Sequence, residues 1–143
     1  MSAALRTVDH AQVAHAFAQQ GIPALSFGVG GFNILSLHPA NPIRNFAARD
    51  AEFAAISAQL GVDKTPENLV LLGDLNATPY CTGLKDVMRH LKLRNARAGR
   101  GLLGTYPVWL PTAALRIPID HVLVGENIVV RRFSRMQLGE VNN

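Results

Sequence analysis

A single cysteine, Cys81, occurs among the 143 residues of this chain, so an internal disulfide is excluded. The low cysteine count fits a reducing compartment, and we favour the cytoplasm, although one cysteine is also neutral on this point. No apolar run approaches the roughly 20 residues that a membrane-spanning helix needs. The first residues lack a charged segment followed by an apolar one, so the sequence predicts no signal peptide.

Charged residues are also scarce, at 17%, whereas apolar residues make up 48% of the chain. This composition is typical of a folded globular protein and excludes a disordered one. A length of 143 residues supports one domain built around one core.

The net charge of +4 is unevenly distributed along the chain. Ten Lys and Arg residues and three acids lie between Lys85 and Arg135, which gives this stretch +7 and leaves the remainder at −3. Such asymmetry suits an anionic partner, either nucleic acid or another phosphate ester. The alternative is a solvated basic face, because the basic residues lack the interleaved aromatics of a base-stacking surface.

A buried strand that ends in polar side chains is predicted between Asn68 and Pro79. The apolar run from Leu69 to Leu72 predicts a strand buried on both faces, and Pro79 ends any extended pairing. Because residues two apart on a strand share one side, Asp74 and Asn76 should project together. A carboxylate beside an amide suits water activation and contact with phosphate oxygens, whereas the alternative is a plain polar turn.

Hydrophobic periodicity and turn residues predict three helices and five further strands. We expect helices at 9–20, 45–60 and 82–91, and strands at 22–29, 32–38, 103–109, 119–124 and 128–135. In the helix at 45–60, the apolar stripe is Phe46, Phe53, Ile56 and Leu60.

Several polar and aromatic residues around these elements are expected to have structural roles. In the helix at 45–60, Arg49 and Glu52 should face outward, with Glu52 solvated. Residues 94–101 should form a basic surface loop, and Trp109 should serve packing.

Four motifs in fixed order resemble the endonuclease/exonuclease/phosphatase superfamily, the fold of DNase I and the abasic-site endonucleases. The motifs are Ser36-Leu-His38-Pro39, Gly73-Asp74-Leu-Asn76-Ala-Thr78-Pro79, Gly104-Thr105-Tyr-Pro107 and Ile117-Pro-Ile-Asp120-His121-Val-Leu-Val124. The resemblance covers residues 22 to about 138. It implies an α/β protein with a four-layer α-β-β-α sandwich, of which this chain makes about one half, a mixed sheet with helices on one face.

The same resemblance implies metal-assisted hydrolysis of a phosphate ester. Asp74 would position or deprotonate the attacking water, and Asn76 and His38 would hold the phosphate. Asp120 would orient a histidine from a terminal Ser-Asp-His motif. On the residues alone, His38 could instead be a strand-end histidine bonded to a loop carbonyl. His121 should point away from Asp120 on its strand, and we give it no catalytic role.

Two groups that the superfamily uses have no counterpart here: the glutamate that binds Mg²⁺ (or Mn²⁺) and the terminal histidine. We therefore expect Asp74 to form only a weak, incomplete metal site and the chain alone to show little turnover. Residues 1–21 would be a helical segment of uncertain role, and residues 22–143 a partial catalytic domain. The alternative is a binding or assembly module that keeps the fold without the chemistry, and a third possibility is a nucleic-acid binder.

A half-sandwich should leave one apolar sheet face open, with residues such as Leu35, Leu71 and Val122 or their strand neighbours exposed. We expect a second copy of the chain, forming a homodimer, or the missing half-domain to cover this face. The helix at 9–20, folded back over the open face, is the other candidate.

Overall fold

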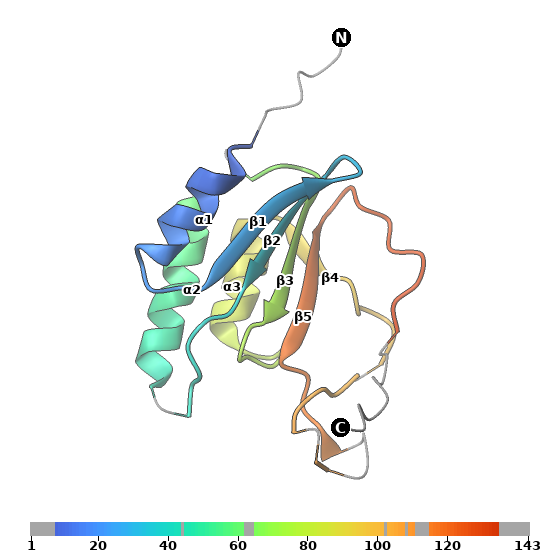
Figure 1. Cartoon of the computed structure of the whole chain (residues 1–143). Helices are drawn as coiled ribbons and strands as arrows, with labels where there is room; N and C mark the ends of the chain where they lie inside the picture. Colours follow the sequence, from blue (N-terminus) through green and yellow to red (C-terminus); the bar gives the residue numbers. More distant parts are fainter. Residues whose placement is uncertain are drawn as a thin grey trace, which may run out of the picture.

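The computed structural model describes residues 8–43, 45–61, 65–101, 103–107, 109–110 and 115–134. These residues form α1 (His10–Ala18), β1 (Ala24–Val29), β2 (Phe32–Leu37), α2 (Phe46–Leu60), β3 (Leu69–Asp74), α3 (Thr82–His90), β4 (Leu93–Asn95) and β5 (Asp120–Gly125). The strands make one five-stranded sheet in the order β1-β2-β3-β5-β4 (Figure 1). β2 and β3 are parallel and the other neighbours are antiparallel, so the predicted α/β class with a mixed sheet is confirmed.

Turn and cap residues set the boundaries of the first half of the chain. The Asp9 side chain accepts a hydrogen bond from the Gln12 backbone at the start of α1, and Asn45 does the same for Ala48 at the start of α2. Gly30 and Gly31 join β1 to β2 with φ angles of +54° and +81°, which glycine adopts without steric cost. The predicted helices at 9–20, 45–60 and 82–91 and the hairpin are thereby confirmed to within a few residues.

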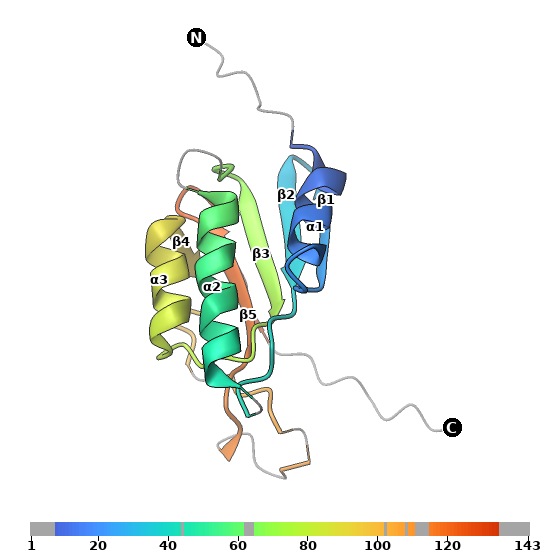
Figure 2. The same ribbon diagram turned by 90° about the vertical axis from the view of Figure 1, so that its left-hand side faces the viewer.

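The helices of the described chain lie on one face of the sheet, and in Figure 2 they stand in front of the strands. Phe17 of α1, Phe53 of α2 and Leu84 of α3 belong to the same buried core, together with Leu35 and Leu71 of the sheet. The prediction that the helix at 9–20 could fold over the open face is therefore wrong. α1 lies beside α2 in the helix layer because this position buries Phe17 in the core against the sheet.

The opposite sheet face is apolar and open to solvent at its β1-β2 edge. The side chains of Leu25, Phe27, Val29 and Phe32 are 42–60% exposed. The expectation of an open apolar face is confirmed. On β2 and β3 the strand neighbours of Leu35 and Leu71 lie on this face, because the register places Leu35 and Leu71 themselves under the helices at 1% exposure.

Alternation along β3 and β5 also decides which of their side chains reach this open face. Val70, Leu72 and Val122 lie there and are half-buried. β3 is thus fully buried on one face only, which corrects the prediction of a strand buried on both faces.

The second half of the chain has less regular structure than its sequence predicts. The described part of 103–109 contains one isolated bridge, Tyr106 to Ile117, in place of a strand, and Trp109 is 77% exposed instead of packed. Within residues 128–134 no strand is present, and position 135 of that predicted strand lies outside the described residues. Backbone groups here bond to arginine side chains, as at Arg100 and Val130, instead of to a neighbouring strand.

None of the helices in the described ranges has the length and apolar character needed to span a membrane. The described structure amounts to one sheet and one helix layer, which is two of the four layers that the sequence resemblance implies.

Candidate active site

Three polar side chains lie in a row across the open face, where β2 and β3 end and β5 begins. The register pairs Asp74, the last residue of β3, directly with Asp120, the first residue of β5. His38 follows β2 and stands two residues beyond the Ser36–Leu72 pair, which brings it beside Asp74. Alternation along extended strands directs all three side chains to the open face. Residues from three separate motifs therefore meet at one end of the sheet.

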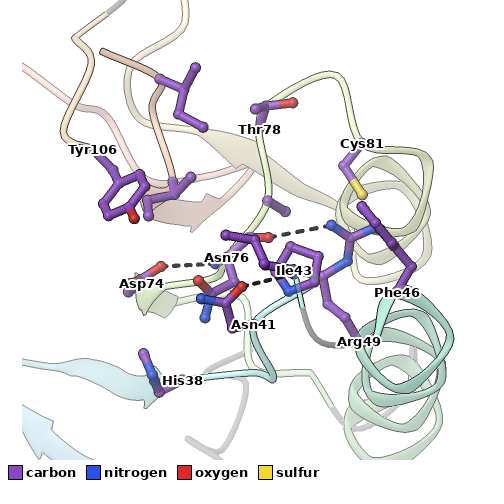
Figure 3. A pocket seen from close by; sticks show the side chains of 14 residues that line it. His38, Asn41, Ile43, Phe46, Arg49, Asp74, Asn76, Thr78, Cys81 and Tyr106 are labelled. Atoms are coloured by element: carbon purple, nitrogen blue, oxygen red, sulfur yellow. Dashed lines mark hydrogen bonds between the residues drawn. The ribbon is translucent and has the colours of Figure 1, made fainter.

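Asp74 and Asn76 approach each other differently from the sequence prediction. β3 ends at Asp74, and Asn76 has a left-handed backbone with φ of +49°, so strand alternation does not relate the two side chains. Instead, the Asp74 carboxylate accepts a hydrogen bond of 2.9 Å from the Asn76 backbone N–H, which closes a local turn. This turn still brings both side chains to the same pocket (Figure 3).

Asn76 is held from three directions and is 8% exposed. Its backbone N–H donates to Asp74, and its side-chain amide donates to the Pro39 carbonyl at 2.8 Å. Its backbone carbonyl accepts a hydrogen bond from the Arg49 guanidinium at 3.4 Å. One amide hydrogen is thereby used, and the second hydrogen and the amide oxygen can serve a ligand. The site thus contains a preoriented amide beside a carboxylate.

The hollow around these groups has a volume of about 420 Å³. His38, Asp74 and Asn76 supply its polar side, while Phe46 and Tyr106 belong to its rim (Figure 3). Asp120 is not among the lining residues, although its neighbour Ile119 is. The hollow can therefore take a polar group such as a phosphate at His38 and Asn76, next to an apolar wall.

Arg49 of α2 is a lining residue that sequence reasoning missed, because it was placed on the outer helix face. It is 9% exposed, with its guanidinium 5.4 Å from the Phe46 ring centroid and 5.8 Å from that of Phe53. It also pairs with Asp50 at 2.8 Å. The signal was available, since positions 46, 49 and 53 share one helix face. Phe46, assigned to the core stripe, is 64% exposed instead.

Glu52 does not face solvent as a free carboxylate. It accepts a hydrogen bond of 2.5 Å from the backbone N–H of Ala40 and so fixes the loop that follows His38. The prediction of a solvated Glu52 is therefore wrong, and the residue has a structural role near the site.

His121 lies on the opposite side of β5 from Asp120, as predicted, and is 2% exposed. Burial lowers the pKa of His121 most, and the Arg97 cation lowers it further. The hydrogen bond to Ala77 and the charges of Asp120 and Asp74 act in the opposite direction. Burial likewise lowers the pKa of Arg97, with Asp120 acting against it. The prediction of a surface loop at 94–101 is thus wrong in two respects, because β4 (Leu93–Asn95) includes its first two residues and Arg97 is only 5% exposed.

The carboxylates at the site fit part of a Mg²⁺ coordination shell. Asp74 and Asp120 occupy directly opposed positions, and Mg²⁺ commonly binds one or two carboxylates together with waters and substrate phosphate. In the described part of the chain, however, no three His, Cys, Asp or Glu residues gather closely enough to hold a metal ion. The two carboxylates therefore supply only part of the ligands that a Mg²⁺ ion needs.

Comparison with known proteins gives one family and several solved structures. The model of the Endonuclease/Exonuclease/phosphatase family matches residues 6–141. Sphingomyelinase C from Streptomyces griseocarneus is 20% identical, with a TM-score of 0.47, over 73% of this chain and 42% of that chain. A beta hairpin deletion mutant of beta toxin from Staphylococcus aureus is 13% identical, with a TM-score of 0.45, over 80% of this chain and 51% of that one. This chain thus spans about half the length of these structures. No curated protein matches it.

Proposed function

Because the chain belongs to the endonuclease/exonuclease/phosphatase family, we propose that it acts in metal-dependent hydrolysis of phosphate esters. The observation that supports this most directly is the row of His38, Asp74 and Asp120 across three strand ends, with Asn76 fixed beside it. An imidazole, a carboxylate and an amide around one hollow, with a second carboxylate on the neighbouring strand, suit a phosphate group and an attacking water.

Each residue has a distinct role in this proposal. Asp74 positions or deprotonates the water, since its side chain lines the hollow and only one of its carboxylate oxygens accepts the Asn76 N–H. Asn76 donates its second amide hydrogen to a phosphate oxygen, and His38 contacts the same phosphate from the end of β2. Asp120 orients a histidine contributed by a second polypeptide segment. The reaction is an in-line displacement at phosphorus, in which water adds as the alcohol leaves.

The proposed cofactor is Mg²⁺ or Mn²⁺, with Asp74 as its ligand from this chain. The ion would stabilise negative charge on the phosphoryl oxygens. Because the described residues offer two adjacent carboxylates at most, we propose weak metal binding by this chain alone and further ligands from a second polypeptide segment.

The proposal also includes a partner for the open sheet face. The exposed side chains at the edge of this face form one patch, made of Leu25, Phe27, Val29 and Phe32. A second sheet packed face to face would bury this patch. For the chain in isolation we propose a second copy as the occupant, and for a longer parent the missing half-domain, with residues 22–143 as the partial domain.

The basic excess of the second half gives limited support to nucleic-acid binding. Four of its arginines donate to backbone carbonyls, namely Arg94 to Ile128, Arg97 to Leu103, Arg100 to Val130 and Arg116 to Leu110. These guanidinium groups keep their charge, but part of their hydrogen-bonding capacity serves folding, so fewer donors are free to contact a polyanion than the sequence suggests. We therefore rank a phosphate-ester hydrolase above a binding module.

The test is hydrolysis of bis(4-nitrophenyl) phosphate with Mg²⁺ by the assembly that contains this chain, with and without a chelator. We expect Asp74→Asn to lower kcat at least roughly a hundredfold, because the amide keeps the shape and removes the charge. Asp86→Asn is the matched control, since Asp86 makes a surface ion pair with Arg89 and should leave kcat unchanged. Near wild-type turnover by Asp74→Asn would refute the assigned role of Asp74.

A further inference from the structure

Two buried basic side chains, His121 and Arg97, lie directly behind the site and have no role in the reaction proposed above. They are 2% and 5% exposed. In the described part of the chain neither one forms an ion pair with a carboxylate. Burying an imidazole and a guanidinium costs stability unless each is well hydrogen-bonded, so their contacts should indicate why they are there.

The contacts of His121 define its protonation. Its Nε2 lies 2.7 Å from the Ala77 carbonyl oxygen, which can only accept, so Nε2 carries the proton. Its Nδ1 then accepts from the Asn95 amide at 3.1 Å and from Arg97 at 3.4 Å. The Asn95 orientation is fixed independently, because its amide oxygen accepts the Arg97 backbone N–H at 3.0 Å. A neutral His121 ring with its proton on Nε2 therefore has a matching donor or acceptor for Ala77, Asn95 and Arg97.

Arg97 extends the same network to two other segments. Its guanidinium donates to the Leu103 carbonyl at 3.3 Å and to the Asp120 carbonyl at 3.2 Å. Two residues after Leu103, the Thr105 hydroxyl lies 3.3 Å from the Ile119 backbone N–H and 3.4 Å from that of Asp120. The network therefore contacts the turn after β3, the segment before Tyr106 and the first residue of β5.

These three segments carry the site. Ala77 follows Asn76 directly, Tyr106 lines the hollow, and Asp120 faces Asp74 across the sheet. Hydrogen bonds between strands align β3 with β5, but the turn that contains Asn76 and Ala77 lies beyond the end of β3. The Leu75 N–H donates to the Ile119 carbonyl at 3.0 Å, which joins the start of this turn to the segment before β5. Among the described residues, the hydrogen bond from a side chain of β5 to this turn is the His121–Ala77 contact, with the two donors behind it.

We propose that His121 and Arg97 form a buried brace that positions the Asp74–Asn76 turn relative to Asp120. Both are positioning residues, and neither touches the substrate. The inference rests on the proposed hydrolysis for its catalytic consequence, while its structural content is independent of it. A displacement of the turn by about 1 Å is enough to lower a rate on the order of a hundredfold.

The deciding experiment compares His121→Phe with His121→Gln. Phenylalanine fills the space without hydrogen bonds, and glutamine can still donate to Ala77 and offer an acceptor to Arg97. We expect amide hydrogen exchange at Asn76 to accelerate roughly tenfold or more in His121→Phe and to stay near wild type in His121→Gln. In wild type, nitrogen NMR should show a proton on Nε2 and none on Nδ1. His90→Phe, at an exposed position on α3, is the control.

Activity adds a second readout. In the hydrolysing assembly, kcat of His121→Phe should fall roughly tenfold to a hundredfold with KM little changed, and His121→Gln should restore most of it. Unchanged Asn76 exchange in a folded His121→Phe variant, or a proton on Nδ1 in wild type, overturns the brace. Absence of hydrolysis by wild type refutes the proposed function instead, and the exchange data still decide the brace.

Discussion

His121 contributes both to the stability of the fold and to the position of the site. Its ring is buried and neutral, with a donor to Ala77 on one side and acceptance from Arg97 and Asn95 on the other. A protonated ring would turn Nδ1 into a donor that faces two other donors. The stability of the fold should therefore depend on the protonation of this residue.

Lowering the pH below the ordinary histidine pKa of 6.5 should destabilise the protein through His121. Burial, the main cause, and Arg97 lower its folded-state pKa, against Ala77, Asp120 and Asp74. Above pH 6.5 the ring is neutral in both states. Below it the unfolded chain binds the proton first, so the free energy of unfolding falls by up to about 1.4 kcal/mol per pH unit until the folded pKa is reached.

Urea denaturation at pH 7.5 and 5.5 measures this loss. The loss between the two pH values should be larger in wild type than in His121→Gln, because the other histidines are common to both proteins. An equal loss in the two proteins would mean that His121 titrates alike in the folded and unfolded states.

At the scale of elements, β2 and β3 come very close where β3 approaches its end. Gly73 has φ of +140°, and a Cβ atom there would lie 2.1 Å from the Leu37 carbonyl oxygen. Leu37 is the last residue of β2 and precedes His38. The absence of a side chain at Gly73 therefore lets two strands converge on the site.

Gly73→Ala should destabilise the fold by roughly 2–4 kcal/mol, because the backbone clash adds to the strain of the φ angle. Gly30→Ala is the matched control: its φ of +54° is also positive, but no atom lies within 4 Å of the added Cβ. It should cost about 1–2 kcal/mol. Urea unfolding of both variants checks this, and equal losses would mean that the close approach is relieved by a small shift.

Elements with strong local signals were the predictable ones. Hydrophobic periodicity and turn residues predicted the helices, and the motif order indicated that His38 and Asp74 belong to one site. Cross-strand pairing then explains why they meet. Local pattern could not reveal the burial of Arg97, because a basic residue in a segment rich in arginine resembles a surface residue. Its partners are backbone carbonyls, at Leu103 and Asp120, which the local pattern does not indicate. It could not place Asn76 either, since a left-handed residue after a strand breaks the alternation rule.

At the scale of the whole molecule, the open sheet face exposes apolar side chains to water, which is unfavourable for an isolated chain. Helices cover one face, and the patch of Leu25, Phe27, Val29 and Phe32 remains 42–60% exposed. Burial of such apolar surface contributes about 25 cal/mol per Å², which favours association when two patches meet. An isologous pair would bury the same patch on both copies.

The isolated chain should therefore sediment at micromolar concentration with twice the 15.4 kDa mass of one chain. Phe27→Glu places a charge in the patch and should give monomers with unchanged circular dichroism. Ala54→Glu, on the exposed side of α2, should leave the dimer intact. A clean 15.4 kDa species that unfolds cooperatively would contradict the dimer.

The central claim, that water attacks phosphorus at a site organised by Asp74, is tested most directly by isotope transfer. Bis(4-nitrophenyl) phosphate is hydrolysed in ¹⁸O-labelled water by the assembly that contains this chain, and the products are examined by ³¹P NMR and mass spectrometry. We predict one ¹⁸O atom on the phosphorus of 4-nitrophenyl phosphate, none in 4-nitrophenol, and loss of this product with Asp74→Asn. Label in 4-nitrophenol, or the same labelled phosphate formed at an equal rate by Asp74→Asn, would contradict the account.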